Sequence, residues 1–321
     1  MIARDRQMLG RTANGLFWMF RYLERAENTA RLIEAGLRMG LTRDIVTAEE
    51  EWRSVIATSG QRAAYEAKHG TYTGVQAWNF LLRDKANPNS VLAMFEMVRT
   101  NARLARNAIS GEVWEAVNES WMGLRDFLAR PVSQQSVGEA VAMVRHSGTL
   151  AHGAMTGSML RDASFHFARA GTHLERADST VRILDIKYYL LLPSLAYVGS
   201  SLDTGQWDSV LRSVSGDRAY RWINAGQIDA RRIVEFLVLD DRFPRSLAFC
   251  HSALRDNLAA LARIHGSEGS AQALISEAHT RLSGMTVDDV FKGGLHESLL
   301  RFMADNAAIA EAIAADYRFL G

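Results

Sequence analysis

The chain has 321 residues, of which 48% are hydrophobic and 23% are charged, so its composition is that of a globular protein with enough apolar residues for a sizeable core. Its net charge of +1 excludes the strongly basic surface that nonspecific nucleic-acid binding requires, and we expect no nucleic-acid partner. The single cysteine, Cys250, excludes an internal disulfide and a cysteine-based zinc site.

The apolar runs of the sequence indicate no membrane segment. The first residues, MIARDR, are not followed by the apolar segment of a secretory signal. No run of 18 apolar residues occurs, and the longest apolar stretch, residues 188–192, ends at Pro193. We therefore predict a cytoplasmic protein that does not bind a membrane.

The elements expected in chain order are helices. Apolar side chains recur at spacings of three and four in residues 16–37, which predicts one long helix that Gly40 ends. Further helices are predicted to begin at Thr47, Ser90 and Thr286, whose hydroxyls suit the first position of a helix. The sequence has four prolines and no alternating strand pattern of useful length. The predicted fold class is all-α.

One ten-residue string occurs twice. Residues 23–32 read LERAENTARL and residues 174–183 read LERADSTVRI, so six of ten positions are identical. The repeat keeps Glu-Arg, a second carboxylate three residues later and a second arginine. Helix packing alone would repeat the apolar residues and not these charged ones.

Two further blocks repeat in the same order. Residues 52–65 recur as residues 207–220, an offset of 155, and residues 80–101 recur as residues 236–257, an offset of 156, whereas the first string has an offset of 151. Repetition over such a length indicates an internal duplication. We predict one structural unit, residues 1–321, made of two helical-bundle halves, 1–157 and 158–321. The simplest packing of such halves has pseudo-two-fold symmetry.

The repeated string forms a candidate central motif. Helical spacing places both carboxylates and the second arginine of each string on one stripe. If the two helices cross near the pseudo-axis, Glu24 would pair with Arg176 and Glu175 with Arg25, locking the halves in register. The motif comprises Arg21, Glu24, Arg25, Glu27, Asn28 and Arg31 in the first copy and Glu175, Arg176, Asp178 and Arg182 in the second.

Two other interpretations of this motif are open. Its arginines suit an anion or a peptide carboxylate, because guanidinium groups bind carboxylates through two parallel hydrogen bonds. Its carboxylates resemble those of a metal-binding bundle, but such bundles place His three residues after Glu, whereas Glu27 and Asp178 stand there. His166 and His173 would have to supply the imidazole. Because the adjacent arginines would repel a cation, we predict no metal and no other cofactor.

A second candidate patch combines two turns that precede predicted helices. Its residues are Asn87, Asn89, Ser90, Arg245 and Ser246. Ser246 would cap a helix whose free N–H groups lie beside Arg245, and Ser90 would cap the counterpart helix. Turn and cap structure alone also explains both segments. No nucleophile elbow, phosphate-binding loop or dinucleotide fingerprint is present, so we expect no catalytic residue.

Five segments of the chain, residues 11–31, 87–90, 99–103, 174–178 and 243–246, closely resemble the bacterial alpha-E family. That family takes its name from an all-helical prediction and a Glu-Arg motif. One departure is Phe20, at a position in the first helix where the resemblance leads us to expect glycine. Backbone contact at Phe20 is therefore expected to be looser.

The resemblance implies a context more than an activity. Family members are encoded beside a circularly permuted ATP-grasp protein that resembles a carboxylate-amine ligase, and beside a transglutaminase-like peptidase. This implies a non-enzymatic helical accessory protein that partners the ligase in peptide or isopeptide modification, with a peptide as a further partner. The alternative is an enzyme, or an anion- or peptide-binding protein, that uses the Glu and Arg residues at the centre of the bundle.

Overall fold

The computed structural model describes residues 10–40, 45–190 and 201–319, and every regular element among them is helical, which confirms the all-α prediction. The helices are α1 (Gly10–Gly40), α2 (Ile45–Thr58), α3 (Arg62–Glu66), α4 (Gly74–Arg83), α5 (Val91–Leu104), α6 (Gly111–Phe127), α7 (Val137–Ser158), α8 (Ala163–Leu190), α9 (Ser201–Ser213), α10 (Asp217–Ile223), α11 (Ala230–Val238), α12 (Leu247–His265), α13 (Ser270–Ser283), α14 (Val287–Lys292) and α15 (Leu295–Asp316), with a 3-10 turn at Arg106–Ala108.

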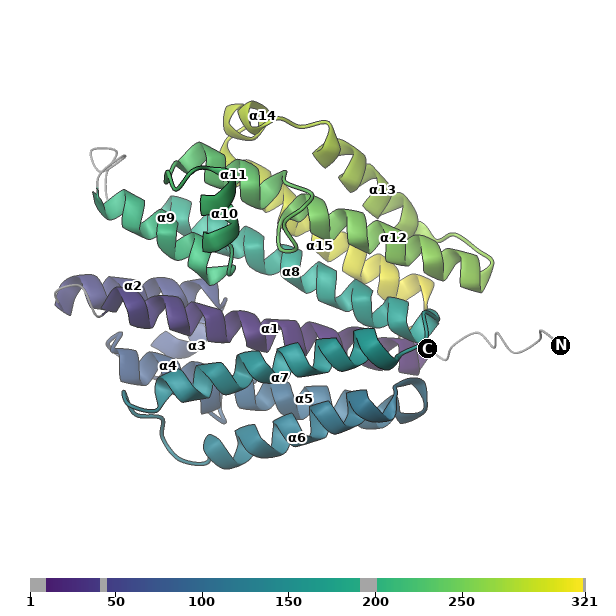
Figure 1. The fold of residues 1–321 in the computed structure, drawn as a ribbon, viewed down its shortest axis with the longest axis horizontal. Helices are drawn as coiled ribbons and strands as arrows, with labels where there is room; N and C mark the ends of the chain where they lie inside the picture. The colour runs from purple at the N-terminus through teal and green to yellow at the C-terminus, as the bar shows by residue number, and fades with distance from the viewer. Residues whose placement is uncertain (1–9, 41–44, 191–200, 320–321) are drawn as a thin grey trace.

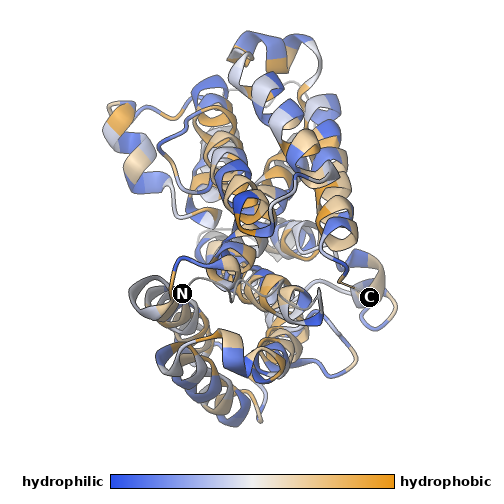
Figure 2. Cartoon of the chain, turned by 90° about the vertical axis from the view of Figure 1, so that its right-hand side faces the viewer, coloured by the Kyte–Doolittle hydropathy of each residue, from blue (hydrophilic) through white to orange (hydrophobic). Residues whose placement is uncertain are grey.

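The helices form two groups that meet along α1 and α8 (Figure 1). In the first group α5 and α7 pack on α1, and α6 packs on both of them. In the second group α12 and α15 pack on α8, and α13 packs on both of those. Figure 2 looks along the helices and shows the two groups one above the other. The boundary predicted between residues 157 and 158 falls in the last turn of α7.

Helix α1 has the apolar stripe that the sequence predicts, and it ends at Gly40 as expected. Leu16, Met19 and Leu23 are completely buried. The two central helices approach closely at Gly171 of α8, where a Cβ atom would overlap the carbonyl oxygen of Phe17. A side chain at this position would therefore push α8 away from α1.

Phe20 packs closely through its side chain, and the looser backbone contact expected at this position stays a prediction. Phe20 is completely buried, and its ring centroid lies 5.5 Å from that of His152 in α7. A close backbone contact made by a glycine occurs where α8 meets α1, at Gly171. The aromatic ring fills the space that a glycine at position 20 would leave between α1 and α7.

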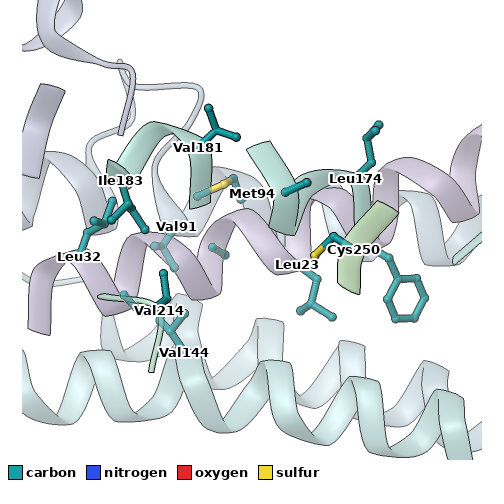
Figure 3. Packing of buried hydrophobic residues seen from close by; sticks show 14 of the residues in the cluster. Leu23, Leu32, Val91, Met94, Val144, Leu174, Val181, Ile183, Val214 and Cys250 are labelled. Carbon is teal, nitrogen blue, oxygen red and sulfur yellow. The ribbon is translucent and has the colours of Figure 1, made fainter. Parts of the chain in front are cut away.

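One hydrophobic core extends through both groups of helices. Figure 3 shows buried side chains of α1 and α8, such as Leu32 and Ile183, together with Val91 of α5 and Val144 of α7. Fully burying each aliphatic side chain of this kind contributes about 1.5 to 3 kcal/mol. The two groups are thus held together by shared apolar packing as well as by the charged residues described below.

The predicted helix starts are confirmed at two of three positions. The hydroxyls of Ser90 and Thr286 accept hydrogen bonds from the backbone N–H groups of Ala93 and Asp289, three residues on. The start predicted at Thr47 is wrong, because α2 already begins at Ile45. Acidic residues after a threonine also suit the first turn of a helix, so the pattern did not fix the boundary.

Some sequence-based predictions fall outside the described residues. These are the N-terminal segment 1–6, the end of the apolar stretch 188–192 and Pro193. In the part of the chain that the structure describes, none of the helices has the length and apolar character needed to cross a lipid bilayer.

Candidate functional site

The two Glu-Arg pairs of the repeated string bind each other across the α1–α8 contact, as the sequence predicts. Arg25 donates from Nε to Oε1 of Glu175 over 2.5 Å and from a terminal nitrogen to Oε2 over 3.1 Å. In the reciprocal pair, Arg176 donates from Nε to Oε2 of Glu24 over 3.0 Å. Arg21 supplies a further hydrogen bond to Glu175 over 2.8 Å. Both carboxylates are buried, so the motif joins the two groups of helices through charge-assisted hydrogen bonds.

Further charges surround Glu24 on the side facing α7. Arg245 donates to the carboxylate of Glu24 and, over 3.2 Å, to Oδ1 of Asn28. Arg31 donates to Oε2 of Glu27 over 2.6 Å, and one of its terminal nitrogens lies 4.0 Å from Glu24. We call the group formed by Glu24, Glu27, Arg31, His152, Arg176 and Arg245 the closed cluster.

Arg245, predicted as part of the second candidate patch, contacts Glu24 and Asn28 of the central motif and belongs to this cluster. The loop before α12 holds it in place: Ser246 caps the helix by accepting from the Phe249 N–H over 3.0 Å. The Thr180 hydroxyl donates to the carbonyl oxygen of Arg245 over 2.8 Å. With its backbone fixed on α8, the Arg245 side chain extends inward to α1. The contact joins residues 221 positions apart, which no local pattern reveals.

The charges of the closed cluster determine its protonation. Burial alone would raise the pKa of Glu24, but the nearby Arg176 and Arg245 guanidinium groups outweigh burial and hold that pKa well below its usual range. Burial lowers the pKa of Arg245 to about 10, which still leaves the guanidinium protonated at neutral pH. The cluster therefore holds two carboxylates against three cationic arginines.

His152 lies between the two carboxylates of the cluster, although it is not among the site residues predicted from the sequence. Its Nε2 atom is 3.5 Å from Glu24 and 3.4 Å from Glu27. Although burial opposes the charged form, the two neighbouring carboxylates raise the pKa of His152. The available sequence signal was Gly148, one turn earlier on α7, where a Cβ atom would overlap the Glu27 carboxylate.

The same three side chains have the geometry of a possible metal site. One ligand atom each of Glu24, Glu27 and His152 lies within 4.8 Å of the others. However, Arg31, Arg176 and Arg245 already exceed the two carboxylates in charge, so a divalent cation would enter a positively charged environment. This arrangement favours a protonated imidazole between the carboxylates, and the absence of a metal stays a prediction.

On the opposite side of the motif lies an open cavity of about 230 Å³, which we call the seam pocket. Its walls come from α1, from α8, from the end of α2 with the loop after it, and from Asn89 before α5. Arg25 and Arg182 line it together with Glu175 and Asp178. The Nδ2 atom of Asn28 donates to the Ser179 hydroxyl over 2.6 Å at the pocket wall.

The family of the chain follows from a match over most of its length. A family model named Alpha-E, described as "a predicted alpha-helical domain with a conserved ER motif", matches residues 8–318. The chain belongs to the Alpha-E family. Two Glu-Arg dipeptides fit the described motif, at residues 24–25 and 175–176, and in this Alpha-E protein each glutamate binds the arginine of the other dipeptide.

Mycobacterial proteins are among the relatives of this Alpha-E chain. Uncharacterized protein Mb2597 of Mycobacterium bovis and uncharacterized protein Rv2567 of Mycobacterium tuberculosis are each 24% identical to it over 318 residues. The match covers 92% of this chain and 35% of each relative, so the chain spans about one third of their length. No solved structure matches it.

The remaining residues of the predicted second patch have structural roles in the Alpha-E fold. Asn87 donates to the carbonyl oxygen of Phe80 over 3.1 Å and accepts from the backbone N–H of Asn89 over 2.9 Å. Ser90 caps α5. Of the residues in this turn, Asn89 lines the seam pocket.

The two histidines considered as metal ligands lie apart from the motif carboxylates. His166 pairs through Nδ1 with Asn257 over 2.8 Å. His173 is completely buried with its ring centroid 5.9 Å from that of Phe249, and burial holds its pKa well below the usual range. His173 is therefore a neutral core residue at physiological pH.

Proposed function

We propose that this Alpha-E protein is a non-enzymatic helical accessory protein that docks an ATP-grasp carboxylate-amine ligase in a peptide or isopeptide modification system. A transglutaminase-like peptidase would act in the same system. The observation that carries the proposal is the reciprocal binding of Glu24 to Arg176 and of Glu175 to Arg25. The residues that define the family hold the two groups of helices together.

The ionisation of the Glu24 and Glu175 carboxylates supports a structural role for them. A general acid or base works best when its pKa lies near the operating pH. The arginine charges outweigh burial and lower the pKa of Glu24 and of Glu175, so both stay ionised at neutral pH. Each is already hydrogen-bonded to guanidinium groups, which leaves them poorly suited to proton transfer.

The length of the relatives also supports an accessory role. The mycobacterial proteins contain the Alpha-E match in about one third of their length, so in those proteins the helical unit is part of a larger chain. Because an ATP-grasp ligase consumes ATP, the proposal places both proteins in the cytoplasm.

The two groups of helices support the inferred duplication. Packing of α5 and α7 on α1 corresponds to packing of α12 and α15 on α8. The short helices also correspond, because α2 contacts α3 and α4 just as α9 contacts α10 and α11. We infer that the halves 1–157 and 158–321 derive from one ancestral bundle and are related by a pseudo-two-fold axis.

Co-purification with an ATP-grasp carboxylate-amine ligase tests the proposed function. A stable complex in which the ligase turns over faster or with altered product length is the expected result. Turnover of a peptide-like substrate by the Alpha-E protein alone would contradict it and favour the enzymatic alternative. The control is a ligase preparation with Alpha-E protein that carries the destabilising Glu24→Gln substitution, checked for folding by circular dichroism.

A further inference from the structure

The seam pocket and the closed cluster occupy corresponding positions in the two halves. By the offset of 151 residues, Glu175 and Asp178 correspond to Glu24 and Glu27. By the offset of 156 residues, Asn89 of the pocket corresponds to Arg245 of the cluster. Arg245 spans the cluster and binds Glu24, whereas the short Asn89 side chain leaves the corresponding space empty.

Two charged groups of opposite sign border this space and keep unused hydrogen-bonding capacity. Arg182 uses Nε to bind Oδ2 of Asp178 over 2.8 Å, and among the described residues its two terminal nitrogens have no hydrogen-bonded partner. Among the described residues, the Oδ1 atom of Asp178 likewise has no hydrogen-bonded partner, and 21% of the Asp178 side chain is exposed. By contrast, both oxygens of Glu175 are bound by Arg21 and Arg25.

The walls of the seam pocket also supply a hydrogen-bond donor and limit the size of a ligand. Ser179 accepts a hydrogen bond from Asn28, so its own hydroxyl proton is available to an acceptor in the pocket. Leu32 and Ile183 form an apolar part of the wall. The cavity of about 230 Å³ is smaller than the roughly 300 to 1,000 Å³ of sites for drug-sized ligands. A ligand of amino-acid size fits this limit.

We propose that the seam pocket binds a free α-amino acid in its zwitterionic form. Its carboxylate binds the terminal nitrogens of Arg182 and the Ser179 hydroxyl, and its ammonium group binds Asp178. A guanidinium and a carboxylate side by side match the two charges of an α-amino acid, whereas either end of a peptide offers only one of them. This site goes beyond ligase docking and does not depend on it.

Isothermal titration of the purified protein with L-leucine, L-serine and L-glutamate tests the proposal. We expect at least one of these amino acids to bind with one site per chain. Its N-acetyl derivative, which lacks the ammonium group, and its amide, which lacks the carboxylate, should each bind about tenfold or more weakly. Equal binding of the derivatives, or binding of a dipeptide in preference to all three amino acids, would overturn the proposal.

Two substitutions test whether the amino acid binds in the seam pocket. Arg182→Gln should weaken binding about tenfold or more, because it removes the carboxylate-binding nitrogens from a side chain that is 45% exposed. The matched control is Arg62→Gln, since Arg62 forms an equivalent ion pair with Glu66, four residues on, at the surface. Asn89→Arg should abolish binding by filling the pocket as Arg245 fills the cluster.

The outcomes separate this proposal from ligase docking. Thermal melts first establish that each variant folds as the wild type does. If none of the three amino acids binds, or if Arg182→Gln and Asn89→Arg bind as the wild type does, the proposal is wrong. Docking of the ligase is measured independently by co-purification, so either result stands without the other.

Discussion

The closed cluster and the seam pocket show how one repeated motif acquires two different surroundings. In the cluster, Glu24 is bound by Arg176 and by Arg245 from a distant loop, and His152 covers it from α7. In the pocket, Glu175 is bound by Arg25 and Arg21, and the loop position of Arg245 is taken by Asn89. Arg245 and His152 thus distinguish the filled site from the open one.

The difference teaches why charged residues persist at the centre of an apolar bundle. A buried ion pair gives little net stability over apolar packing, but removing one partner leaves an uncompensated charge. The reciprocal pairs therefore act mainly on the register of α1 against α8. Since the carboxylates at the pocket are also paired, the pocket can stay open without leaving Glu175 uncompensated.

The largest effect is expected from Glu24→Gln. This substitution keeps the shape of the side chain but leaves Arg176 and Arg245 without their carboxylate, at a cost of about 3 to 5 kcal/mol in the free energy of unfolding. Urea denaturation measures it. Glu34→Gln serves as control because Glu34 pairs with Arg38 and Arg145 near the surface, where a loss of about 1 kcal/mol or less is expected. Similar losses at both positions would remove the distinction between a buried and a surface pair.

Exchanging the two loop residues, Arg245 and Asn89, tests the difference between the closed cluster and the seam pocket directly. Arg245→Asn should cost about 2 kcal/mol, because Glu24 loses one of its partners yet keeps Arg176. The reverse change, Asn89→Arg, should alter stability by less than about 1 kcal/mol, since the gain of a new pair is offset by desolvation. Equal and opposite effects of the two substitutions, measured by urea denaturation, would show that the two positions are equivalent.

The pH dependence of stability tests the raised pKa of His152. Its pKa is raised in the folded state, so its stabilising effect is fully present below the unfolded pKa of about 6.5 and is lost as pH rises through the folded pKa. The wild type should exceed His152→Gln by about 1 to 2 kcal/mol in acidic buffer, and by less as pH rises. Denaturation of both proteins across this pH range provides the measurement.

His173 supplies the control of opposite sign for that experiment. Burial lowers its pKa, so in the wild type it reduces stability as pH falls below about 6.5, where the unfolded chain binds a proton that the folded chain does not. The variant His173→Gln should therefore gain on the wild type as pH falls. If the two histidine variants shift in the same direction, the protonation states assigned to them are wrong.

The smallest change in stability is expected when Zn²⁺ is added. Because three arginines already surround Glu24 and Glu27, added Zn²⁺ should leave the thermal midpoint of the wild type unchanged. A clear rise in the midpoint that disappears in His152→Gln would instead establish a metal site at the closed cluster.

The sequence predicted the helices and the reciprocal pairs because both depend on local spacing and on the repeat. Glu24 and Arg176 lie in matching strings, so the partner of each charge was readable from its copy. The roles of Arg245 and His152 were not readable in this way. Their contacts with α1 arise from the packing of a loop and of α7, and neither residue has a like residue at the matching position of the other half.

The seam pocket was also beyond sequence analysis, because a cavity depends on which side chains fail to fill a space. Asn89 was predicted as one residue of the second candidate patch, for which turn structure alone was also an explanation, and the turn does have that structure. Its significance appears only from its position opposite Glu175 and Asp178 in the folded chain.

A double-mutant cycle at Glu24 and Arg176 tests the central claim most directly. The free energy of unfolding is measured for the wild type, Glu24→Gln, Arg176→Gln and the double variant. If the motif joins the two groups of helices by reciprocal pairing, the two substitutions should couple by about 1 to 3 kcal/mol. Additive effects, within about 0.3 kcal/mol, would contradict the account.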